Sequence, residues 1–325
     1  MSSFNIPSSI PASWIGLSFL LLLAANTPAS TNHIPVHASE SIPFSTPEKT
    51  VLSDIEEEDG LGAISFSFGG VTRSDIADTP ASYALSGFDI SAGIGPVGAS
   101  FKRLSFDWQR TSDFVLDTHG QKPWGDLNEA AALLNWGGSI TTQSSYFVMG
   151  GVSVGYEDQT DDAYSLFGGA ILSYQFTSNW SASAGAILSH HPKVATSLEF
   201  VPVLGIDWRA SATNGLTFSL GVPTTEIAWV FRPGTRLVLD MSSFEGGLYR
   251  LADDNPLRPS GYVELVNSSI SLRYETLLWK RLGLSLGVGQ AIDREFKLYD
   301  PDGENEKSYD IENKPGFLAS VSMAF

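Results

Sequence analysis

Apolar and polar residues alternate along almost the whole chain from Leu61 to its end. In the last run, Phe317, Val321 and Phe325 fall on one parity, whereas Ser320 and Ser322 fall on the other. A period of two is that of a β-strand with two different faces, and helical periodicity hardly appears. The same alternation recurs around residues 64–69, 88–93, 104–109, 152–157, 204–209 and 282–289. The pattern predicts an all-β protein.

The connections between these runs fall into two alternating sets. One set is short, at 95–98, 139–144, 176–179, 210–215, 232–235 and 276–280. The other is mostly longer, at 72–82, 111–126, 157–163, 190–196, 251–260 and 299–314, with 222–225 as the exception. Tight turns at one end and longer polar loops at the other are typical of outer-membrane barrels. We therefore expect a transmembrane antiparallel up-and-down β-barrel of about 12–14 strands, with both termini in the periplasm.

Ionisable residues lie on the polar parity in the middle of several strands. In a barrel of this kind the apolar parity faces lipid and the polar parity faces a lumen, where opposite charges pair. A soluble, secreted β-sandwich also alternates and stays an alternative. The predicted lumen-lining residues are Asp207, Arg209, Glu226, Arg236, Asp240, Arg273 and Glu275.

Two local features refine this expectation. The apolar parity changes between Met241 and Phe244, so a β-bulge near Ser242 and Ser243 is expected to restore the two faces. Phe325 ends the chain on the apolar parity, and the last strand must pair with the first because an open sheet edge is costly in lipid. We expect Phe325 at the periplasmic interface, in barrel closure.

The first residues have the composition of an export signal. The apolar run 15–25 is too short to span a bilayer, and small-residue cleavage sites follow at Ala29 and Ala38, although no Lys or Arg precedes it. The predicted organisation is a signal peptide over 1–38 with cleavage after 29 or 38, an acidic disordered periplasmic linker over 39–60, and the barrel over 61–325.

The formal net charge is −17, which argues against nucleic acid as a partner because a basic surface is missing. The chain has no cysteine, so disulfides and thiolate chemistry are excluded.

Three segments between residues 201 and 250 resemble a bacterial family of outer-membrane β-barrel proteins that carries a domain of unknown function. They are "PVLGIDWR" (202–209), "LGVPTTEIAW" (220–229) and "FEGGLYR" (244–250). The resemblance implies an outer-membrane location and that the insertion machinery reads the aromatic terminus Phe325. It implies no activity.

Few residues are candidates for catalysis or metal binding. After signal removal the histidines are His119, His190 and His191, and the last two are expected to be exposed at a strand end. Nothing in their spacing holds a base beside a nucleophile, so we predict no enzyme. The acidic segment 299–313 lacks the spacing of a calcium loop, and a solvated loop is expected there. No cofactor and no metal are predicted.

The sequence therefore predicts an outer-membrane barrel, with a channel or transporter for small solutes as the favoured function. The expected partners are outer-membrane lipid, the barrel insertion machinery and a small solute. A non-conducting structural or surface-interaction barrel is the alternative. A barrel hydrolase that depends on His190 or His191 is less favoured.

Overall fold

The computed structural model describes residues 62–325, except 112–120, 195–197, 211–213, 280 and 305–306. The predicted signal peptide, the acidic linker and His119 lie outside the described residues. No helix in the described part of the chain is long and apolar enough to cross a membrane. The described residues form fifteen strands: β1 (Gly62–Asp75), β2 (Ser82–Ile94), β3 (Val97–Gln109), β4 (Leu127–Ser139), β5 (Ser144–Tyr156), β6 (Tyr164–Gln175), β7 (Trp180–His190), β8 (Leu198–Arg209), β9 (Gly215–Val222), β10 (Thr224–Arg232), β11 (Thr235–Arg250), β12 (Tyr262–Trp279), β13 (Leu282–Tyr299), β14 (Lys307–Ile311) and β15 (Lys314–Ala324).

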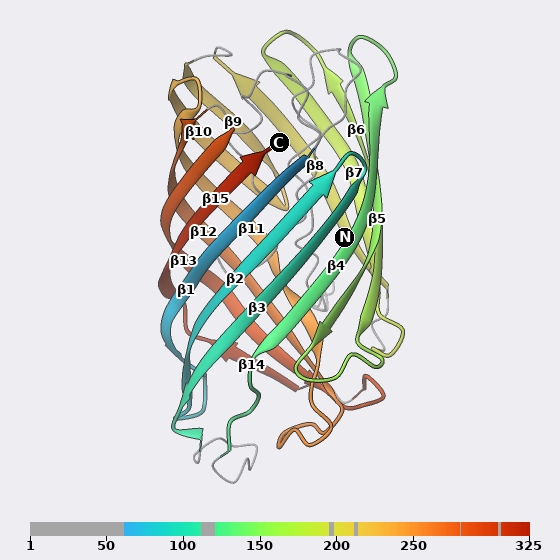
Figure 1. Cartoon of the computed structure of the whole chain (residues 1–325), viewed down its shortest axis with the longest axis vertical. Coiled ribbons are helices and arrows are strands. Elements are labelled where there is room, and N and C mark those ends of the chain that lie inside the picture. Colours follow the sequence, from blue (N-terminus) through green and yellow to red (C-terminus); the bar gives the residue numbers. More distant parts are fainter. Residues whose placement is uncertain (1–61, 112–120, 195–197, 211–213, 280, 305–306) are drawn as a thin grey trace, which may run out of the picture.

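The strands close into one antiparallel barrel (Figure 1). Each strand from β1 to β13 pairs with the next, and β15 pairs with both β13 and β1. The short β14 continues the line of β15 along β13, so the two share one position in the wall. The barrel therefore has 14 strand positions. The prediction of about 12–14 strands in an up-and-down barrel is confirmed.

The two ends of the barrel differ as the connections predicted. Short turns lie at the end that holds the C-terminus, at the top of Figure 1, and longer loops lie at the opposite end. Three predicted boundaries are wrong. β1 continues through 72–75, β12 continues through 276–279, and the expected loop 299–314 contains β14. In the last two places the pairing with β13 extends the sheet beyond the point where the apolar alternation stops.

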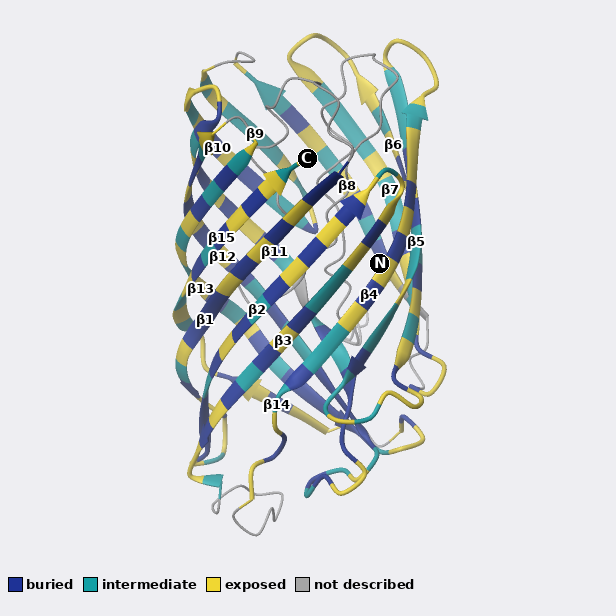
Figure 2. Ribbon diagram, viewed as in Figure 1, coloured by how far each residue is buried: buried dark blue, intermediate teal, exposed yellow. Residues whose placement is uncertain are grey.

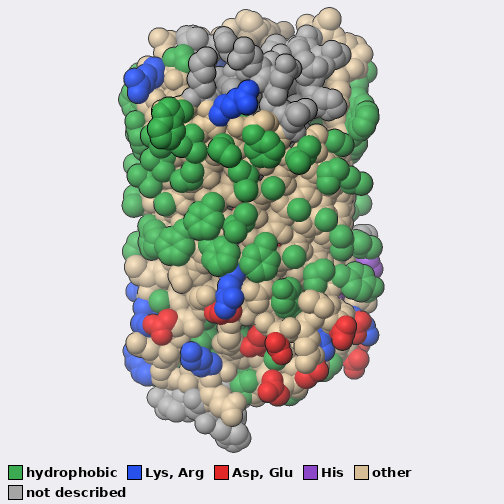
Figure 3. All heavy atoms as spheres, in the orientation of Figure 1, with side chains coloured by type: hydrophobic (Ala, Val, Ile, Leu, Met, Phe, Trp, Pro, Cys, Tyr) green, Lys and Arg blue, Asp and Glu red, His purple; other side chains and the backbone are tan. Residues whose placement is uncertain are grey.

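The two faces of the wall alternate along each strand (Figure 2). On β1, Ile64, Phe66 and Phe68 are exposed on the outer surface, whereas Ser65 and Ser67 are buried inside. On the face that Figure 3 shows, outward apolar side chains cover the part of the barrel nearer the short turns. An apolar exterior with a polar interior is the reverse of a soluble barrel and fits a lipid environment.

Nearer the long loops this polarity inverts. Leu104, Phe106 and Trp108, which the alternation assigned to lipid, are buried in the interior. Their outward neighbours on β3 include Arg103 and Asp107, and charged side chains gather on this part of the surface in Figure 3. The outer surface here is suited to water, so the apolar face of the strand turns inward to form a core.

The sheet also closes a second time at the long-loop end. Arg250 of β11 pairs in parallel with Tyr156 of β5, and the Glu157 N–H donates to the Arg250 carbonyl at 2.8 Å. Ile76, just after β1, bridges Ile311 of β14. Strands β6 to β10 are left out of this closure. We call the nine strands β1–β5 and β11–β14, where they close in this way, the small ring.

The two largest apolar clusters of the described residues lie in different parts of the barrel. The larger core draws on the small ring, β15 and its loops, with members such as Tyr83, Phe106, Trp124 and Phe296 and none from β6–β10. Rings of about eight strands are filled by their own side chains, and this core fills the small ring in that way. The second core lies on the inner face of β4–β8. Its members are Ala131, Leu133, Phe147, Met149, Phe167, Ile171, Ile187, Val201 and Val203.

The predicted β-bulge is confirmed on β11. The register with β12 shifts by one residue between Ser242 and Glu245, from Ser242↔Ser269 to Glu245↔Asn267. The extra residue keeps Tyr249, beyond the bulge, buried inside the barrel.

Candidate functional site

Five of the predicted lumen residues form one chain of alternating charges on the inner face of β10–β12. Arg236 contacts Glu226 at 3.3 Å and Glu275 at 2.7 Å. Arg273 contacts Glu275 at 3.3 Å and Asp240 at 3.0 Å. We call this chain the charge ladder. Glu226 on β10 lies directly opposite Asp240 on β11, and two negative charges in that position repel each other. The neighbouring arginines offset this repulsion.

The ladder is buried and further tied by hydroxyl groups. Arg273, Glu275 and Asp240 are each at most 3% exposed, and the Ser271 hydroxyl donates to Asp240 at 2.6 Å. Each charge therefore depends on its neighbours instead of on water.

The other two predicted residues lie on β8, on the same inner parity. Asp207 is 7% exposed, and its carboxylate accepts from the Ser181 hydroxyl at 3.4 Å. Asp207 lies opposite Ser181 on β7 and Ser219 on β9, and Ser219 lies opposite Glu226. Arg209 is half-buried near the short-turn end. The structure thus places Asp207 in a row that leads across the wall to the ladder.

Further buried charges escaped the sequence reading. Lys102 contacts Glu129 at 3.2 Å and lies over the ring of Tyr249 at 5.4 Å, and the Tyr249 hydroxyl donates to Glu129 at 3.3 Å. Glu264 lies 4.0 Å from Lys297 and accepts from the Tyr299 hydroxyl at 2.7 Å. The signal that could have identified these pairs is the cross-strand register. Lys102 stands directly opposite Glu129, and this pairing is visible only once the strands are aligned.

Glu157 holds the second closure together. Its carboxylate accepts from the Gly125 N–H at 2.6 Å, the Ala252 N–H at 3.0 Å and the Asn255 side-chain amide at 3.0 Å. Gly125 belongs to the β3–β4 connection and the other two donors to the β11–β12 connection, so one side chain from the β5–β6 connection joins the loops that seal the small ring. Nothing in the local sequence indicates this role, because Glu157 stands in an acidic loop.

A different environment lies along β5–β9. Their inward positions carry small residues that lie opposite one another across neighbouring strands: Ser145, Ser173, Ser183, Gly205 and Gly221. All five keep partial solvent exposure, although they face inward. Inward serines of β1 and β2, such as Ser65 and Ser91, are buried instead. The inner face of β5–β9 is therefore less completely covered than that of β1 and β2, and we call this row of five positions the small-residue lane.

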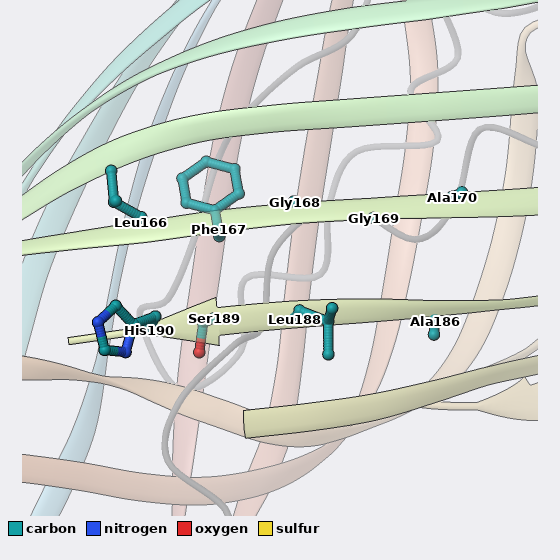
Figure 4. Close-up of a pocket in the computed structure, with 9 residues that line it drawn as sticks. All are labelled: Leu166, Phe167, Gly168, Gly169, Ala170, Ala186, Leu188, Ser189 and His190. Atoms are coloured by element: carbon teal, nitrogen blue, oxygen red, sulfur yellow. The ribbon is translucent and has the colours of Figure 1, made fainter. Parts of the chain in front are cut away.

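The histidines occupy two different environments. His190 is exposed on the outer surface, at the rim of a shallow apolar groove between β6 and β7 that Gly168 and Ala186 help to line (Figure 4). His191 was expected to be exposed, and this is wrong. It is 7% exposed, and its ring packs against Tyr262 at 5.0 Å between centroids. Burial, and then the neighbouring His190, lower the pKa of His191 to about 4, although Asp162 opposes the shift.

The acidic segment 299–313 bonds to itself where it is described. The Asp300 carboxylate accepts from the backbone N–H groups of Asp302 and Glu304, at 3.1 and 2.8 Å. Among the described residues no group of three or more His, Cys, Asp or Glu side chains is arranged to hold a metal ion.

The C-terminal residue completes the wall. The Phe325 N–H donates to the Gly62 carbonyl and the Gly62 N–H donates to the Phe325 carbonyl, both at 2.9 Å. The Phe325 side chain is 44% exposed on the outer surface.

A closed antiparallel barrel with an apolar outer belt and ionic pairs inside defines a transmembrane β-barrel of the outer-membrane class. No family model matches the chain, and no curated protein matches it. Among solved structures, it is similar to the Pseudomonas putida toluene transporter TodX at 9% identity and a TM-score of 0.46, over 85% of this chain and 93% of that one. It is also similar to the COG4313 outer-membrane channel from Pseudomonas putida F1 at 9% identity and a TM-score of 0.41, over 82% of this chain and 96% of that one. The KdgM porin in complex with disordered oligogalacturonate follows at 8% identity and a TM-score of 0.38, over 81% of this chain and 99% of that one. At these values the similarities carry no argument beyond what the strand pairing shows.

Proposed function

We propose that the protein is a channel for small solutes across the outer membrane. The observation that carries this proposal is the small-residue lane, because inward Ser183, Gly205 and Gly221 keep solvent exposure inside a closed wall. A barrel packed solid at this level would bury them, as the small ring buries its own inward residues. The charge ladder and Asp207 would then form the charged part of the lumen wall beside the lane.

Three further assignments belong to the same proposal. The outward Phe325, paired at the seam of the wall, would be read by the insertion machinery and would rest against outer-membrane lipid. The chain would belong to the barrel family with a domain of unknown function that its motifs resemble. Its role would be non-enzymatic, because the two described histidines lie on the lipid-facing surface and in a packed loop instead of beside a nucleophile.

A non-conducting structural barrel is the second candidate, and one observation favours it. The apolar core of the small ring fills the interior at the long-loop end, so a straight axial path through that ring is obstructed. A conducting barrel therefore needs a path beside the small ring, where β6–β10 leave the closure.

Single-channel recording separates the two candidates. We expect discrete current steps from the refolded barrel in a planar bilayer. Ser183→Trp, which places a large ring in the lane, should lower the conductance, whereas Ala184→Trp on the adjacent outward position should not. Absence of current in the wild type, or equal currents in both variants, would contradict a solute path along β5–β9.

A further inference from the structure

Strands β12 and β13 have two different faces at the long-loop end. Val263 and Leu298 lie opposite each other and belong to the core that fills the small ring. Tyr262 and Tyr299, the next pair in the register, face the other way, because successive side chains of a strand alternate between its faces. They face the path beside the small ring, where β6–β10 leave the closure, and we call this path the side route.

Residues 191–194, which follow β7 directly, lie across the mouth of the side route, and we call them the strap. Val194 packs with Tyr262 and Tyr299 in one apolar cluster whose three members are at most 2% exposed. Leu248 of β11 packs against the same cluster. The strap thus bridges from the end of β7 to β11, β12 and β13.

Two other connections hold the strap in place. The Lys193 ammonium group contacts the Asp162 carboxylate of the β5–β6 connection at 3.4 Å, and the Tyr262 hydroxyl donates to the Asp162 carbonyl at 3.2 Å. A Cβ on Gly303 would lie 1.8 Å from the Lys193 carbonyl oxygen, so the β13–β14 connection lies directly against the strap. Since water screens the Lys193–Asp162 pair, the buried apolar contacts carry most of the packing.

His191 is the buried titratable group of the strap. Its ring packs against Tyr262 at 5.0 Å between centroids, and its Nδ1 accepts from the Lys193 N–H at 3.3 Å. An Nδ1 that accepts a hydrogen bond carries no proton, so the packed strap holds the neutral ring. A proton on Nδ1 removes this acceptor and places a charge where little water reaches it.

The surroundings of His191 in the described chain carry charges of both signs. Burial lowers its pKa, the adjacent His190 lowers it further, and Asp162 opposes the shift. The other titratable or charged groups on the elements packed around the strap are Lys193, Tyr262, Glu264, Lys297, Tyr299, Arg250 and Asp302.

From this geometry we propose that the strap is a gate on the side route and that protonation of His191 releases it. The inference deepens the proposed channel function and rests on it. The packed strap holds the ring neutral, whereas a displaced strap exposes the ring to water. A fall in pH below about 6.5 therefore favours the open gate.

Single-channel recording of the full chain at pH 7.5 and pH 4.5 tests the gate. With a pKa of about 4 for the packed ring and about 6.5 for the exposed ring, the closed-to-open ratio should fall about 70-fold between these pH values. His191→Phe keeps an aromatic ring against Tyr262 and cannot be protonated, so it should lose this dependence. Asp162→Asn is the matched control, because it removes the carboxylate beside the strap and keeps His191.

The outcomes separate the gate from the channel. Openings that become more frequent at pH 4.5 in the wild type and in Asp162→Asn, but not in His191→Phe, support the gate. A pH dependence that His191→Phe retains, or that Asp162→Asn abolishes, overturns the gate and keeps the channel. Equal open probability of the wild type at both pH values does the same. Absence of current at both pH values overturns the channel, and the gate with it.

A cross-link tests the strap without any change at His191. The chain has no cysteine, and the side chains of Lys193 and Asp162 are 45% and 56% exposed, so Lys193→Cys and Asp162→Cys can be joined by a short bis-maleimide. The linked barrel should stay closed at pH 4.5, whereas the same variant capped with N-ethylmaleimide should open. Linking Asp253→Cys to Ser260→Cys, whose native side chains meet at 2.7 Å within the β11–β12 connection, should leave the openings unchanged. Equal currents from the linked and the capped barrel would overturn the gate.

Discussion

Replacement of Arg273 by methionine tests whether the interior of the barrel is dry beside the charge ladder. Arg273 is 3% exposed and lies between Asp240 at 3.0 Å and Glu275 at 3.3 Å. Methionine keeps the length and the apolar stem of the side chain and removes only the guanidinium group. Glu275 would keep its contact with Arg236 at 2.7 Å, whereas Asp240 would lose its contact with Arg273 and keep the hydrogen bond from the neutral Ser271 hydroxyl.

The expected loss follows from this environment. Removal of one partner from a buried ion pair costs about 3–5 kcal/mol, because the remaining charge stays desolvated. The surface pair of Arg103 and Asp126 is the internal control, with side chains 47% and 36% exposed. Since water screens such a pair, Arg103→Met should cost no more than about 1 kcal/mol.

Urea unfolding of the refolded barrel in lipid vesicles measures both free energies on one protein. Adding Asp240→Asn to Arg273→Met should recover part of the loss, because the stranded carboxylate disappears. If Arg273→Met cost no more than Arg103→Met, water would reach the ladder freely and the burial argument would be wrong.

Two further predictions concern the long-loop end. Because the pKa of His191 is lowered to about 4 in the fold and is about 6.5 when unfolded, the folded state binds fewer protons between these values. The loop after β7 therefore has its full packing stability above pH 6.5 and loses up to about 3 kcal/mol of it as the pH falls toward 4. Hydrogen exchange of residues 191–194 measures this loss, and His191→Phe should remove the pH dependence. A Cβ on Gly155 would lie 2.2 Å from the Leu248 carbonyl oxygen, so Gly155→Ala should destabilise the small ring by about 1–3 kcal/mol in urea unfolding. Gly150→Ala on the same strand, with its nearest neighbour at 3.6 Å, should change stability by less than about 0.5 kcal/mol, and equal effects would contradict the close approach of β11 to β5.

The alternation of apolar and polar residues was sufficient to predict the wall of the barrel, because surrounding lipid requires apolar or small side chains at outward positions. Where the outer surface meets lipid, as on β1 and β15, every outward position must be apolar or small, and the period of two is unbroken. The bulge on β11 was predictable for the same reason, since an uncorrected shift would have turned its apolar side chains inward.

The assignment of the apolar parity to the outer surface failed where no lipid covers that surface. On β3 the alternation of Leu104, Phe106 and Trp108 is perfect, yet the residues face a core and the charged parity faces outward. A period of two identifies two faces and does not say which solvent each face meets. The partners of the charges also depend on register, which aligns Lys102 with Glu129 across 27 residues of sequence. The seven predicted lumen residues were selected by parity alone, and the pairing of five of them into a ladder emerges only from the alignment of three strands.

The two closures of the sheet share a single origin in the short β9–β10 hairpin. If β10 continued as far as β11, Arg250 would meet a neighbour in sequence order and would not reach Tyr156. Because β9 and β10 stop at Pro223, the free end of β11 crosses to β5, and the interior beyond it becomes narrow enough for side chains to fill. Obstruction along the axis is thus a consequence of the missing β10–β11 pairs, so a change that lengthened the β9–β10 hairpin is expected to draw β11 away from β5 and to open the small ring.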